Sequence, residues 1–219
     1  MPRIEPFETH PTLYEEWFTK HRAAYGSELQ AIRSLTPSHG RWIEVGVGTG
    51  RFAVPLGIAY GVEPSPTMAR IARSRGLEVV RGVAEALPFG QATFDGVLFV
   101  TTICFVDNLP LAMREAHRVL RPGGMLVVGY VDRDSPLGRR YQARRARSLF
   151  YRAATCYSTA ELVSTLERAG FHRFTYVQTI LHPIAETEDI EPTVPGYGRG
   201  SFVVVRGITR LRSTREGVE

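Results

Sequence analysis

Cysteine and lysine are scarce in this sequence of 219 residues. The two cysteines, Cys104 and Cys156, are too few and too isolated for a disulfide framework or a thiolate metal site, so we expect reduced thiols and no bound metal. Lys20 is the single lysine, and arginine therefore carries nearly all the positive charge behind the formal net charge of +5. Because the arginines are spread along the chain, apart from a cluster between Arg133 and Arg152, the charge alone does not indicate a nucleic-acid partner.

Long hydrophobic runs are also missing. No stretch approaches the roughly 18–20 uninterrupted apolar residues of a membrane span, and the polar N-terminus lacks the apolar centre of a signal peptide. We therefore expect a soluble, cytoplasmic protein without a membrane span. With 43% hydrophobic residues the chain can bury one core, which predicts a single domain over residues 1–219.

Strand-like and helix-like segments alternate from residue 42 onward. The apolar run 94–100 suits a strand buried on both faces, hence a central one. Two later strands, 174–180 and 202–206, are predicted to pair antiparallel. The pattern predicts an α/β fold with a Rossmann-like, doubly wound sheet of seven strands, mostly parallel with an antiparallel last strand, plus an N-terminal helix. The expected parallel strands are 42–45, 58–63, 77–81, 94–100 and 125–131, and the main expected helices are 11–35, 66–75, 109–120, 136–150 and 158–169.

The predicted domain divides into three parts. Residues 1–40 form an N-terminal helical lid, 41–131 the cofactor-binding half, and 132–219 the acceptor-side half. Within the last part, the connection 182–201 is longer than usual and rich in proline and glycine. That length favours a functional flap over a simple hairpin.

A glycine-rich loop follows the first predicted strand directly. Gly46, Gly48 and Gly50 allow backbone amides to approach a nucleotide or the amino-acid tail of a cofactor, because no side chain obstructs them. Glu63 ends the second strand 17 residues after Gly46, where a carboxylate accepts hydrogen bonds from ribose hydroxyls. The loop and the carboxylate together predict a cofactor site.

These residues belong to a set of five segments: Glu-Val-Gly-Val-Gly-Thr-Gly at 44–50, Gly-Val-Glu-Pro-Ser at 61–65, Ala-Glu-Ala-Leu-Pro-Phe at 84–89, Phe-Asp at 94–95 and Leu-Arg-Pro-Gly-Gly at 120–124. With them the chain resembles the class I S-adenosylmethionine-dependent methyltransferases, especially the small ones related to ubiquinone and menaquinone biosynthetic methyltransferases. The resemblance implies S-adenosylmethionine as cofactor, S-adenosylhomocysteine as product, and direct methyl transfer to a small-molecule acceptor rather than a nucleic acid.

The resemblance also implies roles for individual residues. Glu44 and Gly46 would face the methionine end of the cofactor, Glu63 would hold the ribose, and the segment 83–85 would line the adenine. The implied cofactor-binding residues are Glu44, Gly46, Gly48, Gly50, Glu63, Pro64, Val83, Ala84, Glu85 and Thr101.

Three departures from the family pattern bear on the site. Val83 stands where many relatives place an aspartate that binds the adenine amino group, so backbone groups or Glu85 must substitute. Pro55 and Gly57 truncate the helix after the glycine loop, which leaves the placement of the loop end open. The segment 101–105 replaces the histidines that relatives often carry, and the acceptor therefore stays open.

Aromatic residues are the main candidates for the acceptor pocket. Tyr14, Trp17 and Tyr25 share the N-terminal helical pattern and would either cover the site, attracting the sulfonium cation, or simply pack on the core. Phe105, after the fourth parallel strand, would border the acceptor, as the resemblance implies. Tyr197, between two glycines of the flap, would reach the same pocket or serve an interface.

Polar candidates are fewer. His21 lies on the same helical pattern as those aromatics and is the candidate proton acceptor, with a surface or packing role as the alternative. Arg140, Arg144 and Arg147 follow at spacings of four and three, which predicts a basic stripe. The stripe would bind a carboxylate or phosphate of an anionic acceptor, or would be a solvated helix face.

Two other functions compete with methyl transfer. A nicotinamide-dependent oxidoreductase also uses a glycine turn and an acidic residue, but the spacing here is Gly-x-Gly-x-Gly and no lysine follows the loop. A regulator that binds the cofactor without turnover would keep the same motifs. The oligomeric state and the acceptor atom are not predicted by any of these patterns.

Overall fold

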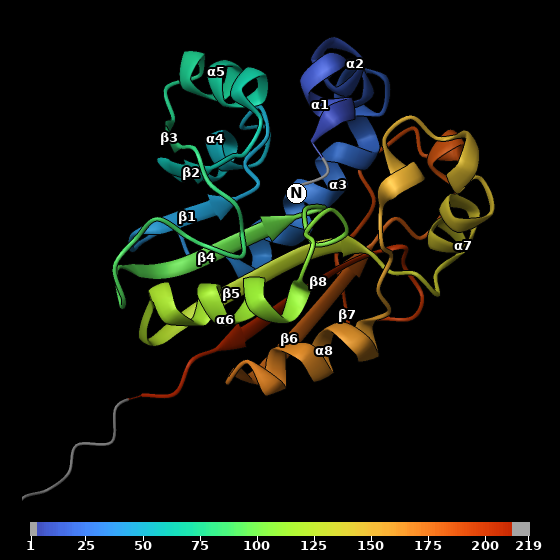
Figure 1. The fold of residues 1–219 in the computed structure, drawn as a ribbon. Helices are drawn as coiled ribbons and strands as arrows, with labels where there is room; N and C mark the ends of the chain where they lie inside the picture. Colours follow the sequence, from blue (N-terminus) through green and yellow to red (C-terminus); the bar gives the residue numbers. More distant parts are fainter. Residues whose placement is uncertain (1–3, 212–219) are drawn as a thin grey trace, which may run out of the picture.

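Eight strands form one sheet in the computed structural model, which describes residues 4–211 (Figure 1). Their spatial order is β3-β2-β1-β4-β5-β8-β6-β7. The strands are β1 (Trp42–Val45), β2 (Tyr60–Val62), β3 (Glu78–Val80), β4 (Phe94–Val100), β5 (Leu120–Val131), β6 (His172–Thr179), β7 (Val194–Pro195) and β8 (Phe202–Ile208).

The first five strands are parallel, as the alternating pattern predicted. Strand β4 lies between β1 and β5, and its apolar side chains are buried on both faces. Gly96 of β4 pairs with Trp42 of β1, and a Cβ at Gly96 would lie 2.2 Å from the indole ring. The glycine therefore gives the ring the room it needs to cross the strand.

The C-terminal strands are antiparallel to their neighbours. Strand β8 pairs with both β5 and β6, which confirms the predicted antiparallel pairing of the last strands. The sheet has eight strands rather than the predicted seven because β7 forms inside the flap against β6. Two residues are too short for a periodic pattern to reveal, and Pro195 is tolerated because β7 is the edge of the sheet.

Helices cover both faces of the sheet, so the predicted α/β fold is confirmed (Figure 1). The core on one face includes residues of α6 and α8, and the core on the other includes residues of α3, α4 and α5. The helices are α1 (Glu5–Thr9), α2 (Pro11–Lys20), α3 (Arg22–Leu35), α4 (Ala53–Leu56), α5 (Pro66–Ser74), α6 (Leu109–Val119), α7 (Pro136–Ala143) and α8 (Thr159–Arg168), with 3-10 turns η1 (Arg145–Arg147), η2 (Tyr151–Ala153) and η3 (Ile184–Glu186).

Two predicted helices are interrupted. The segment 11–35 forms α2 and α3, because His21 leaves the helical region with φ −115° and ψ 48°. This break turns α2 toward the glycine loop while α3 packs on the sheet. The segment 136–150 stops being α-helical at Ala143, where exposed arginines of like charge follow without an apolar face to bury.

Within the described range, no helix is both long and apolar enough to cross a bilayer. Residues 4–211 also contain no group of three or more histidine, cysteine, aspartate or glutamate side chains placed to hold a metal ion. The ends of the predicted single domain, 1–3 and 212–219, lie outside the described residues.

Candidate active site

The glycine loop leaves β1 at the carboxyl edge of the parallel strands. Gly46 and Gly48 have φ of +71° and +54°, in the left-handed region that side chains disfavour. A Cβ at Gly46 would lie 2.3 Å from Cγ2 of Thr102, which follows β4. Gly46 is therefore needed both for its backbone conformation and for the close approach of two loops.

Glu63 is buried at the end of β2, and its carboxylate is hydrogen-bonded to the glycine loop. Its Oε2 accepts a hydrogen bond from the Gly48 N–H at 2.8 Å, and its Oε1 accepts one from the Ser65 N–H at 2.9 Å. Burial raises the pKa of Glu63 to about 7, although both N–H groups oppose the rise. The carboxyl thus titrates near neutral pH and is held in one orientation.

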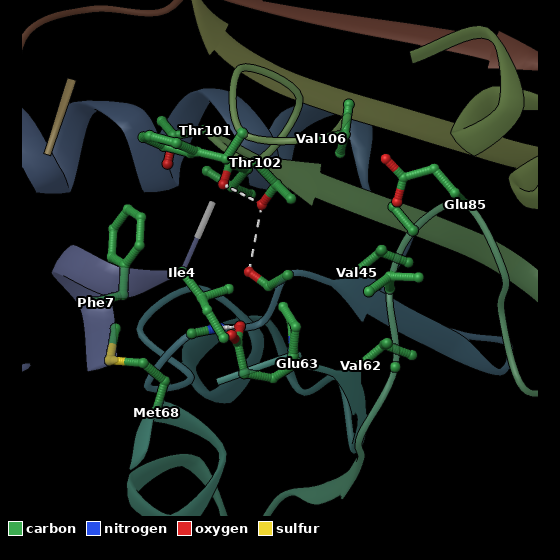
Figure 2. A pocket seen from close by; sticks show the side chains of 18 of the residues that line it. Ile4, Phe7, Val45, Val62, Glu63, Met68, Glu85, Thr101, Thr102 and Val106 are labelled. Atoms are coloured by element: carbon green, nitrogen blue, oxygen red, sulfur yellow. Dashed lines mark hydrogen bonds between the residues drawn. The ribbon is translucent and has the colours of Figure 1, made fainter. Parts of the chain in front are cut away.

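A small, partly open space, the inner cavity, lies beside Glu63. Its volume is about 100 Å³, and Figure 2 shows Glu63, Val45 and Val62 on one side of it with Thr101 and Thr102 opposite. From the segment around α1, Ile4 lies next to Glu63 and Phe7 lies at the left of the space in Figure 2. Of the predicted cofactor residues, those that line it are Gly46, Gly48, Glu63, Pro64, Val83, Ala84, Glu85 and Thr101.

Two predicted cofactor residues do not line the inner cavity. Gly50 faces Leu77, whose Cδ1 would lie 2.6 Å from an added Cβ, so Gly50 serves loop packing. Glu44 is 2% exposed on the opposite face of β1 from Val45, and its Oε2 has no hydrogen-bond partner within the described chain. Burial raises the pKa of Glu44 well above its usual range, despite a backbone hydrogen bond from Ala53.

Glu85 was predicted to replace the missing aspartate as the ligand of the adenine amino group, but one of its two carboxylate oxygens is bound to another loop of the protein. Oε1 of Glu85 accepts hydrogen bonds from the N–H groups of Asp107 at 2.7 Å and Asn108 at 3.0 Å. Glu85 therefore anchors the loop before α6 while it also lines the inner cavity. Val83 and Ala84 contribute cavity wall beside it.

A second space of about 350 Å³, the aromatic cavity, adjoins the inner one. Four residues line both: Phe7, Tyr14, Thr101 and Phe105. Thr101 has φ +50°, an uncommon backbone for a β-branched residue, at the junction of the two spaces. Further walls of the aromatic cavity include Trp17, Phe18, Phe52, Tyr141, Phe150 and Tyr151.

The residues predicted for the acceptor pocket and for proton transfer fall into three groups: some line the aromatic cavity, some line neither cavity, and the arginines line a separate groove. Tyr14, Trp17, Phe105 and His21 all line the aromatic cavity. Burial lowers the pKa of His21, with Lys20 adding to the effect, so its imidazole is more readily neutral than usual.

Tyr25 and Tyr197 are corrections to the predicted pocket. Tyr25 lines neither cavity, because its ring packs on Phe52 and its hydroxyl donates to the carbonyl of Arg51. Tyr197 is 52% exposed and packs on Tyr176 at 5.2 Å between ring centroids, away from both cavities. Tertiary packing directs each ring away from the two cavities.

The arginine stripe borders a wider, open space, the outer groove. Arg140, Arg144 and Arg147 line it together with His182 of the flap. The groove shares His21 and Trp17 with the aromatic cavity, but none of the three arginines lines that cavity. The guanidinium groups thus stand outside the aromatic cavity rather than within it.

Two carboxylates fasten the N-terminal helices over the glycine loop. Glu8 accepts hydrogen bonds from the hydroxyls of Ser65 and Thr67 at the start of α5. Glu15 accepts hydrogen bonds from Thr49 and from both Arg51 and Arg75. Partial burial alone would raise the pKa of Glu15, but these partners lower it to about 2.

Glu15→Gln is expected to loosen α2 without unfolding the protein. Losing two partly buried ion pairs should speed amide hydrogen exchange in α2 about tenfold, or about 1.4 kcal/mol of local stability. Because the folded pKa lies below the unfolded value, the stabilisation is present above about pH 4.5 and is lost as pH falls toward 2. Glu16→Gln, on the exposed neighbour, is the control and should leave exchange unchanged. Equal exchange rates in both variants would contradict this role of Glu15.

Several cavity residues were not predicted from sequence. Phe7 sits between the two cavities, and Glu28, Tyr141 and Tyr151 line the aromatic one. For Glu28 the sequence did contain a signal, because this carboxylate lies beside the apolar stripe of a predicted amphipathic helix. The others come from short or irregular segments whose contacts no periodicity reports.

The chain is similar to known methyltransferases. A family model described as a methyltransferase domain matches residues 43–128. A solved SAM-dependent methyltransferase from Thermotoga maritima, described as a possible histamine N-methyltransferase, is 52% identical, with a TM-score of 0.93 over 94% of this chain and 100% of that one.

Two curated proteins extend the comparison. An uncharacterized protein from Methanocaldococcus jannaschii is 39% identical over 91% of this chain and 96% of its own length. The demethylmenaquinone methyltransferase of Roseiflexus castenholzii is also 39% identical, over 40% of this chain and 41% of its own length. The similarity to that enzyme is thus confined to part of each protein.

Proposed function

The chain belongs to the S-adenosylmethionine-dependent methyltransferases, and on that premise we propose that it methylates a small-molecule acceptor bound in the aromatic cavity. The observation that carries the proposal is the common wall of Phe7, Tyr14, Thr101 and Phe105 between the two cavities. An inner site for the cofactor and an adjoining site for the acceptor would bring donor and acceptor atoms together.

The residues around the inner cavity fit the cofactor. Glu63 offers a fixed carboxylate for ribose hydroxyls, and the glycine loop exposes backbone without side chains in the way. Glu44, which the resemblance assigned to the methionine end, does not line the inner cavity and is left out of the proposed site. Because 100 Å³ is below the about 300–1,000 Å³ of typical ligand sites, we expect Ile4 and Phe7 to move aside on binding.

When bound, S-adenosylmethionine supplies a methyl group on a sulfonium: its C–S bond breaks with the electron pair left on sulfur, while an acceptor lone pair forms the new bond. The protein then has to align the two molecules and exclude water. The aromatic rings of Tyr14 and Phe105 line both cavities and would do both. His21, with its lowered pKa, is the proposed proton acceptor if the acceptor atom carries a proton.

The first test is calorimetric titration with S-adenosylmethionine, S-adenosylhomocysteine and NAD. We expect binding of the first two in the micromolar range and none of NAD. S-adenosylhomocysteine production with an acceptor panel then separates an enzyme from a regulator. The panel includes histamine, because the related protein from Thermotoga maritima is described as a possible histamine N-methyltransferase. Binding of NAD alone would contradict the proposal.

An acceptor that extends from the aromatic cavity and also carries an acidic group would have that group recognised in the outer groove. Replacing Arg140, Arg144 and Arg147 together by alanine is expected to raise KM for a carboxylate- or phosphate-bearing acceptor about tenfold, because charge-assisted hydrogen bonds are lost. KM for S-adenosylmethionine should stay unchanged. Arg139→Ala removes a charge from the same helix but outside the groove and is the control. An unchanged KM in the triple variant would leave the arginines as a solvated surface.

A further inference from the structure

One buried carboxyl lines the aromatic cavity without a partner among the described residues. Glu28, on α3, is 4% exposed, and residues 4–211 contribute no hydrogen bond or ion pair to its side chain. Its position differs from that of Glu191, the buried carboxylate of the flap, which accepts hydrogen bonds from Leu181, His182 and Thr187. Glu28 therefore keeps its full hydrogen-bonding capacity for whatever enters the cavity.

A buried carboxyl without a partner lowers the stability of the folded protein. Burying a carboxyl without compensation disfavours its ionised form, and burial raises the pKa of Glu28 to about 8. The ionisable groups that share its cavity are the phenols of Tyr14, Tyr141 and Tyr151, the imidazole of His21, and the exposed Glu16 and Lys20. The phenols carry no positive charge to balance the carboxylate, and burial lowers the pKa of His21.

The walls around Glu28 suit a cation. Rings of Tyr14, Trp17 and Phe105 line the cavity, and aromatic faces attract positively charged groups in addition to apolar ones. Exposed side chains of opposite charge, Glu16 and Lys20, also line this cavity, whereas Arg140, Arg144 and Arg147 line only the outer groove. A ligand with an apolar body and one positive nitrogen would satisfy both the rings and the carboxyl.

We propose that Glu28 binds a basic nitrogen of the methyl acceptor, so that the acceptor is a small aromatic or aliphatic amine. This inference rests on the proposed function, because it names the substrate class of that same cavity. Glu28 is an acceptor-binding residue that holds the ammonium form in place. The nitrogen that is methylated needs a lone pair, so an amine with a single nitrogen gives its proton to His21, the proposed proton acceptor, before the transfer. A neutral alcohol of the same shape would fill the cavity but would not provide a positive charge for the carboxylate.

The test compares matched ligands on matched variants in the presence of saturating S-adenosylhomocysteine. Calorimetry measures binding of 2-phenylethylamine, tryptamine and histamine, with 2-phenylethanol as the neutral match. The wild type should bind at least one amine about 30-fold more tightly than the alcohol, and Glu28→Gln should remove that preference. Glu188→Gln removes an equal charge from an exposed flap position and should retain it.

A second variant distinguishes a ligand-binding role of Glu28 from a role in stabilising the fold. Glu28→Met has similar volume and no charge to bury, so it should lose the amine preference yet raise the thermal midpoint by about 3 °C. A structural role for Glu28 would lower the midpoint instead. Unfolding of both variants, an unchanged amine preference in Glu28→Gln, or failure of all three amines to bind the wild type would each overturn the proposal.

The proposed function has its own readout in the same samples. Titration of each variant with S-adenosylhomocysteine should give the wild-type affinity, because Glu28 does not line the inner cavity. Absence of S-adenosylhomocysteine binding in the wild type would defeat the proposed function. Normal cofactor binding with an alcohol or an acid as the preferred ligand would defeat only the amine assignment.

Discussion

Glu63→Gln is expected to weaken binding of S-adenosylhomocysteine by about two orders of magnitude. The carboxylate can accept from both ribose hydroxyls while it holds the Gly48 and Ser65 N–H groups. An amide keeps one acceptor oxygen and presents an NH2 group where the other acceptor was. Two hydrogen bonds to a charged group at about 1.5 kcal/mol each correspond to this loss. Calorimetric titration measures it.

Glu78→Gln, at the exposed start of the neighbouring strand β3, is the control and should bind normally. The affinity of the wild type should also rise between pH 6 and 8, because Glu63 with its pKa of about 7 becomes ionised over that range. The free energy of unfolding of the protein without cofactor has the opposite pH dependence. The folded state holds a proton that the unfolded state has released, so the free energy of unfolding falls as pH rises from about 4.5 to 7. A pH-independent affinity would contradict the role of Glu63.

Gly46→Ala should cost about 3–4 kcal/mol of unfolding free energy. Part of the loss is the left-handed backbone at φ +71°, worth about 1–2 kcal/mol for an L-residue. The rest is overlap of the new methyl group with Thr102, whose Cγ2, Oγ1 and Cβ all lie within 3.0 Å of it. Urea unfolding followed by circular dichroism measures the difference.

Gly57→Ala supplies a matched control, since Gly57 has φ +73° but no atom within 4 Å of an added Cβ. It should lose only the backbone part, about 1–2 kcal/mol. Equal losses of unfolding free energy in Gly46→Ala and Gly57→Ala would mean that Thr102 moves aside without an energetic cost. The close approach of the two loops would then not be what requires glycine.

Local rules predicted the cofactor half of this chain well. The buried run 94–100 is strand β4, and Ser65 caps α5 by accepting from the Met68 N–H. The sequence also predicted that Glu63 and the glycine loop lie at the same sheet edge. In the structure, the Gly48 N–H of this loop donates a hydrogen bond to the Glu63 carboxylate. Each of these features depends on residues close in sequence or on the parallel order of the strands.

The acceptor side could not be predicted in the same way. The aromatic cavity is assembled from Phe7, Glu28, Phe105 and Tyr151, which come from four separate parts of the chain. Helical periodicity assigned residues 11–35 to one helix, but the break at His21 redirects α2. Tyr25 therefore faces Arg51 rather than the cavity. The direction of a side chain in such a region is a property of tertiary packing and not of local spacing.

The position of Phe7 between the two cavities predicts an order of binding and release during turnover. Its ring lines both cavities and packs on Phe105 at 4.9 Å and on Phe150 at 5.2 Å between centroids. An acceptor already seated among those rings would hold Phe7 across the inner cavity. We therefore expect the cofactor to enter first and its product to leave last. In steady-state kinetics, S-adenosylhomocysteine would inhibit competitively against S-adenosylmethionine and noncompetitively against the acceptor.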